Sequence, residues 1–231
     1  MVRRAVRRAV PATLARVASL GRPSSSRGGR EGVAELVEEI VEIDGDALCL
    51  LRPADPAALL DEEAFAEDEF LPYWAELWPS ARRLVQALPF NLAGRQILEL
   101  GCGLGLPSLV AARRGATVLA TDWAADALAL LGRNASRLGV ALERAHLDWT
   151  RPGDPMVGHR FDLVLAADVA YEQRNVEPLA SLLERLGTEV LLADPGRVAG
   201  AALLERLTAR FDRTDLGGGV SRLRPRGSPP R

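Results

Sequence analysis

The chain has 231 residues, of which 48% are hydrophobic and 26% charged, and this composition predicts one globular α/β domain with a sizeable core. The net charge is −2, but the first 30 residues carry eight arginines and no acid, so the rest carries −10, which argues against binding nucleic-acid phosphates. No apolar run is long enough to span a membrane and two cysteines are too few for a disulfide framework, so we expect a cytoplasmic protein with no membrane partner.

The two ends of the chain differ in composition from the region between them. Residues 1–32 are rich in arginine, and we expect a disordered extension there, with a transit peptide or a start assigned too far upstream as alternatives. Residues 224–231 hold proline, glycine and arginine and are also expected to be disordered. The folded domain is therefore expected over residues 33–223. Its basic residues are all arginine, which we interpret as the mark of a GC-rich bacterial genome.

A β-hairpin extension is predicted at residues 33–52. Val37–Ile43 alternates apolar residues with acids, Asp44-Gly45-Asp46 follows, and Ala47–Leu51 is again apolar. Asp-Gly between two such runs is typical of a tight hairpin turn, because that turn needs positive φ.

An aromatic segment precedes the regular part of the chain. Residues 55–71 are acidic and are expected to form helix and loop, and residues 71–80 then bring Trp74 and Trp78 together with two prolines. Apolar spacing predicts a helix over Ser80–Leu88.

Strands and helices alternate regularly within the core, which is expected over residues 72–216. The predicted strands are 95–100, 117–121, 142–147, 161–167 and 189–193, followed by two short strands at 211–216 and 220–223. Strands this apolar are typical of a parallel sheet covered by helices on both faces. We therefore predict an α/β fold, a Rossmann-like doubly wound seven-stranded sheet with an antiparallel edge strand and a short N-terminal β-hairpin.

The most informative motif is the glycine-rich loop at Glu99–Gly105, directly after the first core strand. Gly101, Gly103 and Gly105 let the backbone turn sharply and approach a ligand, and the next helix offers free N–H groups. A dinucleotide fingerprint would place its last glycine at Leu106, which counts against NAD. Glu99 suits a cationic amino group better than a pyrophosphate.

Three further strand ends carry polar or aromatic residues that suit a ligand. Asp122 can bind ribose hydroxyls or cap a helix, and Asp148 with Trp149 can flank an adenine, although Trp149 can also be a packing residue. Asp168 follows the fourth strand. Ligands of open α/β sheets bind outside the carboxyl ends of the strands, so the joint placement predicts one cofactor site.

These motifs resemble the seven-strand methyltransferases, and within them the lysine methyltransferase-like group (methyltransferase family 16) that includes the electron-transfer-flavoprotein and chaperone lysine methyltransferases. The match covers about residues 70–215, and its more specific parts are Trp78-Pro79 and the D-x-x-Y motif from Asp168 to Tyr171. The resemblance implies S-adenosylmethionine as cofactor, with Asp168 and Tyr171 as catalytic residues. It implies cofactor contacts from Trp74, Trp78, Glu99, Gly101, Cys102, Gly103, Gly105, Asp122, Trp123, Asp148, Trp149, Ala167 and Asp168.

The resemblance also implies N-methylation of a lysine side chain in a protein substrate by a monomeric enzyme. Because an activated methyl donor needs no metal, and no cluster of metal ligands is visible, we expect no metal, and we interpret His146 and His159 as structural or solvated. Tyr73 and Trp74 are candidates for a cation–π wall around the acceptor. The alternatives are an N-methyltransferase of a small amine or heterocycle (nicotinamide-type), a non-catalytic S-adenosylmethionine-binding module, and a dinucleotide oxidoreductase.

Overall fold

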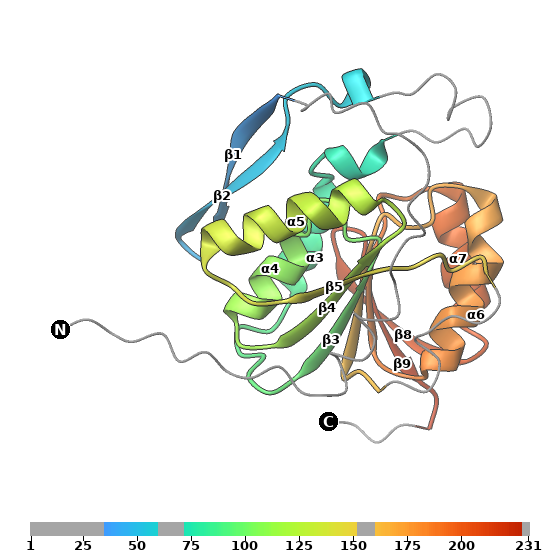
Figure 1. Cartoon of the computed structure of the whole chain (residues 1–231). Coiled ribbons are helices and arrows are strands. Elements are labelled where there is room, and N and C mark those ends of the chain that lie inside the picture. The colour runs from blue at the N-terminus through green and yellow to red at the C-terminus, as the bar shows by residue number, and fades with distance from the viewer. Residues whose placement is uncertain (1–34, 60–71, 152–159, 228–231) are drawn as a thin grey trace.

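The computed structural model describes residues 35–59, 72–151 and 160–227. In these residues the chain forms a seven-stranded sheet, a two-stranded hairpin and five α-helices (Figure 1). The strand order in the main sheet is β5-β4-β3-β6-β7-β9-β8. The chain thus runs outward from β3 to β5 and then returns to build the other half, which is the doubly wound topology predicted from the sequence.

The strands of the main sheet are β3 (Gln96–Leu100), β4 (Thr117–Asp122), β5 (Glu143–His146), β6 (Leu163–Ala167), β7 (Val190–Ala193), β8 (Phe211–Gly217) and β9 (Val220–Pro225). The pairs β5-β4, β4-β3, β3-β6 and β6-β7 are parallel, whereas β9 runs antiparallel to both β7 and β8. The predicted antiparallel edge is confirmed, with β9 as the reversed strand.

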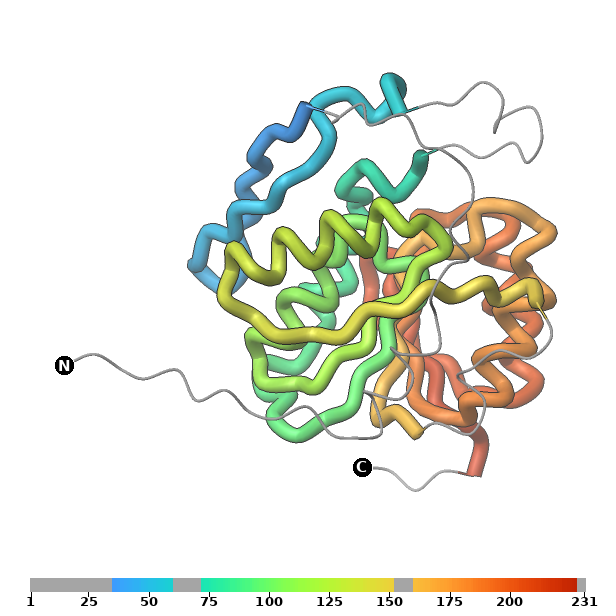
Figure 2. Tube along the Cα trace, viewed as in Figure 1, coloured from blue at the N-terminus to red at the C-terminus, as the bar shows by residue number. Residues whose placement is uncertain are grey.

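Helices cover both faces of the sheet (Figure 2). One face carries α3 (Pro79–Ala87), α4 (Leu106–Arg113) and α5 (Ala125–Leu138), and the other carries α6 (Val176–Leu186) and α7 (Val198–Leu207). Neighbouring residues of a strand point to opposite faces. Ile97 accordingly lies in one core cluster with Leu109 of α4, and Leu98 in the other with Leu179 of α6.

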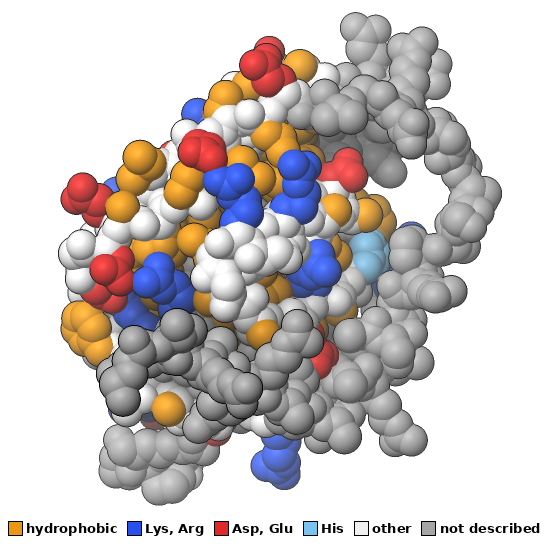
Figure 3. Space-filling view, turned by 60° about the vertical axis from the view of Figure 1, so that its left-hand side comes forward, with side chains coloured by type: hydrophobic (Ala, Val, Ile, Leu, Met, Phe, Trp, Pro, Cys, Tyr) orange, Lys and Arg blue, Asp and Glu red, His pale blue; other side chains and the backbone are white. Residues whose placement is uncertain are grey.

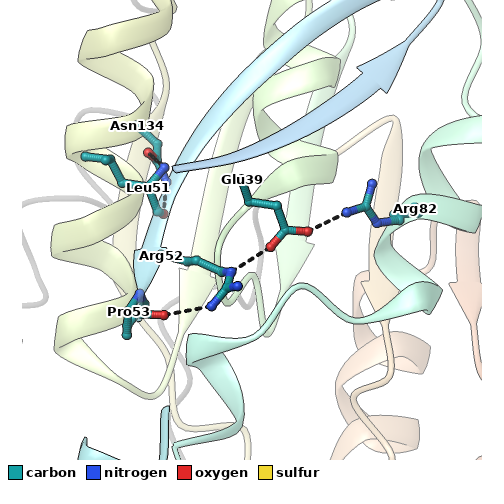
Figure 4. A network of polar contacts seen from close by, with 6 residues as sticks. All are labelled: Glu39, Leu51, Arg52, Pro53, Arg82 and Asn134. Atoms are coloured by element: carbon teal, nitrogen blue, oxygen red, sulfur yellow. Dashed lines mark hydrogen bonds and ion pairs between the residues drawn. The ribbon is translucent and has the colours of Figure 1, made fainter. Parts of the chain in front are cut away.

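The predicted N-terminal hairpin is confirmed as β1 (Leu36–Ile43) and β2 (Asp46–Pro53), with full pairing between the two strands. Asp44 and Gly45 both have positive φ, as the tight turn requires. The hairpin packs outside α5, where the buried Asn134 side chain accepts a hydrogen bond from Leu51 N–H at 2.8 Å and donates to its carbonyl at 3.0 Å (Figure 4).

Ion pairs fix the other side of the hairpin. Glu39 accepts hydrogen bonds from Arg52 at 2.7 Å and from Arg82 of α3 at 2.5 Å (Figure 4), and Arg114 pairs with Asp44 at 2.6 Å. Figure 3 shows arginine and acidic side chains on this outer face, with apolar side chains between them. The mixture of both charges suits a solvated surface better than a phosphate-binding one.

Some boundaries differ from those expected. β9 continues to Pro225, beyond the expected limit at residue 223, because Arg224 and Pro225 pair with Asp212 and Phe211 of β8. The acidic segment begins with the 3-10 helix η1 (Pro56–Leu59), and its remainder lies outside the described residues. The predicted extension 1–32 and His159 also lie outside them. No helix in the described part of the chain is long and apolar enough to cross a bilayer.

Candidate cofactor and acceptor site

A cavity of about 310 Å³ lies at the carboxyl ends of β3, β4, β6 and β7. Its walls come from the loops after these strands and from the segment before α3, which contains the 3-10 helix η2 (Tyr73–Ala75). Ligands of doubly wound sheets bind at this edge, and the volume is at the lower end of the range for small-molecule sites.

The glycine-rich loop after β3 lines the cavity and leads into α4. Cys102 N–H donates to the Thr121 carbonyl at 2.9 Å, and Gly105 N–H donates to the Cys102 carbonyl at 2.7 Å, so the loop is tied to β4 and turns tightly. Gly105 has φ +75°, and a Cβ there would lie 2.3 Å from Leu131 Cδ1, so the position requires glycine. Leu106, where a dinucleotide fingerprint has glycine, is fully buried.

Glu99 is a buried carboxyl group beside this loop. Its Oε2 accepts hydrogen bonds from the backbone N–H of Ser108, at 2.9 Å, and from the Ser108 hydroxyl. Burial raises the pKa of Glu99 to about 8, because desolvation penalises the charged form. A cationic ligand would favour that charged form, so Glu99 suits an ammonium group.

Asp122 ends β4 and connects two loops. Its Oδ2 accepts a hydrogen bond from Gly103 N–H and its Oδ1 accepts one from Ala124 N–H, both at 2.8 Å. Burial raises the pKa of this carboxyl. The N-cap of α5 is Ala124 rather than Asp122, so the helix-capping interpretation is wrong. Asp122 instead fixes the glycine loop, a role that the sequence did not reveal.

Aromatic rings flank the loop at the ends of β4 and β5. A Cβ on Gly101 would lie 3.6 Å from the Trp149 ring, and Trp123 lies against His146 with ring centroids 5.2 Å apart. Asp148 does not line the cavity. Its carboxylate accepts a hydrogen bond from Thr150 N–H at 2.9 Å and pairs with Arg151.

Asp168 lies after β6 and is held by an arginine that the sequence did not indicate. Arg197 Nε donates to Asp168 Oδ1 at 2.6 Å, and Nη2 donates to Oδ2 at 3.3 Å. This hydrogen bonding raises the pKa of Arg197, so the guanidinium stays charged. Asp194-Pro195-Gly196, a turn sequence directly after β7, was the feature that could have directed attention to Arg197.

Aromatic side chains form the wall beside this ion pair. The Tyr73 ring lies 5.0 Å from that of Tyr171 and 6.1 Å from that of Trp78, and the Arg197 guanidinium lies 5.8 Å from the Trp78 ring. Burial raises the pKa of Tyr171, so its phenol stays protonated. The wall can therefore receive an apolar stem that ends in a polar nitrogen.

The structure brings together nearly all of the predicted site residues. Those that line the cavity are Trp74, Trp78, Glu99, Gly101, Cys102, Gly103, Gly105, Asp122, Trp123, Trp149, Ala167, Asp168 and Tyr171. The cavity wall also includes residues that the sequence analysis did not select for the site, namely Glu76, Leu77, Ala81, Leu104, Leu106, Ala124, Val169, Glu172 and Arg197. Burial raises the pKa of Cys102, which therefore contributes a neutral thiol.

A doubly wound sheet with one reversed strand near its edge, a glycine-rich loop after the first core strand and acids after the next strands defines a class I methyltransferase. A family model described as lysine methyltransferase matches residues 75–193. The chain belongs to this family of class I S-adenosylmethionine-dependent methyltransferases.

Two relatives support the assignment. The chain is 35% identical over 138 residues to the electron transfer flavoprotein beta subunit lysine methyltransferase of Danio rerio, over 54% of this chain and 51% of that protein. It is 33% identical over 141 residues to the protein-lysine methyltransferase METTL21E of Mus musculus, over 52% of this chain and 54% of that protein. The chain thus spans about half the length of the relatives it matches.

A solved structure resembles the fold. The 16S rRNA methyltransferase RsmC of T. thermophilus, in complex with AdoMet and guanosine, has a TM-score of 0.54 and 22% sequence identity, over 81% of this chain and 49% of that chain. At this identity the likeness concerns the fold alone.

The cavity residues fit S-adenosylmethionine, which carries an ammonium group, a ribose and an adenine ring. Glu99 is a buried carboxyl that lacks a cationic partner among the contacts of its side chain, which are both with Ser108. Asp122 offers carboxylate lone pairs to hydroxyl donors, and Trp149 and Trp123 offer ring faces. The donor set therefore matches the cofactor of the family part by part.

Proposed function

We propose that the chain transfers a methyl group from S-adenosylmethionine to the side-chain nitrogen of a lysine in a protein substrate. The observation that carries this proposal is the Asp168 carboxylate, which Arg197 holds in a cavity wall that also contains aromatic side chains and the glycine-rich loop. Family membership supports the lysine acceptor. We also propose that the enzyme is a monomer and that it is cytoplasmic, the second point in keeping with its two free cysteines.

The cofactor supplies a methyl group that its sulfonium already activates, so the protein provides proximity, alignment and an uncharged acceptor nitrogen. In this proposal, Glu99 would hold the ammonium group of the donor and Asp122 its ribose, and Trp149 and Trp123 would flank its adenine; Asp148 stays a predicted contact. Tyr73 and Trp78 enclose the stem of the acceptor lysine. Asp168 would accept a hydrogen bond from the amine and so orient the lone pair of the nitrogen for attack, and Tyr171 would pack beside it.

The first test is cofactor binding. We expect S-adenosylhomocysteine to bind the purified protein with micromolar affinity in calorimetry. The substitution Gly103→Arg should abolish this binding, because a Cβ there already lies 3.3 Å from the Trp74 carbonyl oxygen. No binding by the wild type would refute the cofactor assignment.

The second test separates chemistry from binding. Asp168→Asn keeps the shape of the side chain and tolerates the positive φ of 58°, and we expect it to lower turnover about 10²-fold or more while the affinity for S-adenosylhomocysteine changes less than about threefold. Turnover is followed as labelled-methyl transfer into a cell lysate. The chain contains no lysine, so lysine labelling cannot come from the enzyme itself. Equal turnover in wild type and variant would contradict the role of Asp168, and label found only in small molecules would favour a small-amine acceptor.

A further inference from the structure

The ion pair between Arg197 and Asp168 is built into the fold. The two residues follow β6 and β7, which are neighbouring parallel strands, and Asp168 N–H donates to the Ala193 carbonyl at 2.8 Å. The Asp168 side chain is 6% exposed and that of Arg197 37%. The contact uses both carboxylate oxygens, so it fixes the orientation of the carboxylate as well as its charge.

A preformed turn presents Arg197. Asp194 Oδ1 accepts hydrogen bonds from Gly196 N–H at 2.7 Å and from Arg197 N–H at 2.8 Å, and Asp194 itself is buried. Arg197 is the residue just before α7, and its guanidinium lies over the Trp78 ring. The arginine is thus held at its backbone, at its ring contact and at its carboxylate partner, unlike a surface arginine with a free side chain.

Arg197 is the only basic residue in the cavity wall formed by the described residues. The carboxyl groups in the same wall are Glu76, Glu99, Asp122, Asp168 and Glu172. Near the pair lie also Asp194, the phenols of Tyr73 and Tyr171, and Arg174, which pairs with Glu172. Glu99 and Asp122 belong to the cofactor end of the cavity and Glu172 is paired with Arg174, so the removal of Arg197 would leave the charge of Asp168 uncompensated at the acceptor end.

An uncompensated Asp168 carboxylate would oppose the proposed reaction. A lysine ammonium has a pKa of about 10.4 in water, and a carboxylate beside it favours the charged form and raises this pKa further. The nitrogen must first give a proton to solvent water, since only the neutral amine has a lone pair. A carboxylate that is already paired with a guanidinium still has lone pairs to accept a hydrogen bond, but the pair has no net charge to stabilise an ammonium group.

We propose that Arg197 is a positioning residue that orients Asp168 and, by cancelling its charge, keeps the bound acceptor amine in its neutral form. This inference rests on the proposed amine methylation and goes beyond it, because it assigns the deprotonation of the acceptor to an electrostatic balance rather than to a general base. The enzyme therefore methylates the acceptor nitrogen in its uncharged form, although the acidic residues around the cavity attract a positively charged substrate chain.

The test is the pH dependence of kcat, which reports groups in the enzyme–substrate complex. The acceptor probe is poly-L-lysine with labelled methyl donor between pH 6.5 and 9.5. Arg197→Gln removes the charge and Arg197→Lys keeps it. Arg206→Gln is the control, because Arg206 of α7 is an equally exposed arginine whose partners, Glu177 and Glu184, lie outside the cavity wall. For Arg197→Gln we expect the rising limb of kcat to move up by about one pH unit, which is about a tenfold loss at pH 7. Arg197→Lys and Arg206→Gln should keep the rising limb at the pH of the wild type.

A loss of kcat in Arg197→Gln that is the same at every pH, with the rising limb at the pH of the wild type, would overturn the proposal, because a merely structural role produces that result. A rising limb that moves in Arg197→Lys, relative to the wild type, would overturn it too, and this comparison with the wild type can be made even if Arg197→Gln fails to fold. S-adenosylhomocysteine binding by calorimetry reports whether each variant keeps its cofactor site. A wild type that labels neither poly-L-lysine nor a cell lysate refutes the proposed function itself, whereas an active wild type with unshifted variants refutes only the role of Arg197.

Discussion

At the scale of single residues, the cofactor loop depends on positions where no side chain fits. Gly105 and Gly139 both have positive φ, +75° and +66°, but a Cβ on Gly105 would lie 2.3 Å from the fully buried Leu131 whereas one on Gly139 meets nothing within 4 Å. The two glycines therefore separate the effect of backbone strain from the effect of crowding.

We predict that Gly139→Ala lowers the free energy of unfolding by about 1 kcal/mol, from backbone strain alone. Gly105→Ala should lower it by about 2–4 kcal/mol, because overpacking adds to the strain. Urea unfolding measures both changes, and calorimetry with S-adenosylhomocysteine should show weaker binding for Gly105→Ala only. Equal destabilisation by the two substitutions would show that the Leu131 side chain can move aside without lowering the free energy of unfolding.

The buried carboxyl of Glu99 predicts a pH dependence of stability. Its pKa rises from 4.5 in the unfolded chain to about 8 in the fold. Between these values the unfolded chain loses the proton and the folded protein keeps it, so stability falls as the pH rises toward 8 and Glu99 adds no further change above that.

Glu99→Gln should remove this dependence. We expect the variant to gain stability relative to wild type between pH 5 and pH 8, by about 2–4 kcal/mol over the range. Urea unfolding at several pH values measures the difference, with Glu205→Gln on the exposed surface of α7 as a control that should stay parallel to the wild type. If the free energy of unfolding of Glu99→Gln instead follows that of the wild type in parallel from pH 5 to pH 8, Glu99 is ionised over this whole range.

At the scale of elements, the hairpin packs against the rest of the domain near the cofactor loop. Leu51 of β2 belongs to a small apolar cluster with Leu104 of the glycine-rich loop and Leu130 of α5, and Trp74 packs against it. The only side chain that hydrogen-bonds the backbone of Leu51 among the described residues is Asn134. The Asn134 amide thus joins the hairpin to α5, and the apolar cluster joins both to the cofactor loop.

We predict that Asn134→Ala lowers the free energy of unfolding by about 2–3 kcal/mol, because it leaves a buried N–H and carbonyl without partners. Hydrogen exchange should speed up in peptides that cover residues 36–53 before it does in the sheet. Ser136→Ala on the same helix removes only an exposed hydrogen bond to the Gly132 carbonyl and should leave the exchange unchanged. Faster exchange throughout the sheet, at the same rate as in the hairpin, would instead mean that hairpin and domain unfold together.

At the scale of the whole molecule, the sequence predicted the sheet and the position of the site because both follow from periodicity. Apolar runs at regular spacing define β3, β4, β6 and β7, and acids or glycines at their carboxyl ends must meet at one edge. The contact between Arg197 and Asp168 was not predicted, because it joins residues 29 positions apart through side chains whose directions no local pattern specifies. The local pairing of Asp148 with Arg151 was missed for a similar reason, since a side chain that turns back onto its own loop has the same sequence as one that faces a ligand.

The extent of the folding unit gives the last prediction. The sheet, both helix layers and the cavity are formed within residues 35–227, and β1 and β2 contribute Val41, Leu48 and Leu50 to the buried core. A chain that begins at residue 33 should therefore match the full chain in thermal midpoint and in affinity for S-adenosylhomocysteine. A chain that begins at residue 54 lacks these three side chains, each of which stabilises the fold by about 1.5–3 kcal/mol when buried, and should unfold at a much lower temperature or fail to fold. Thermal unfolding with and without S-adenosylhomocysteine compares the three chains. If the chain from residue 33 loses stability or affinity, the first 32 residues take part in the domain; if the chain from residue 54 keeps both, the hairpin is dispensable to it.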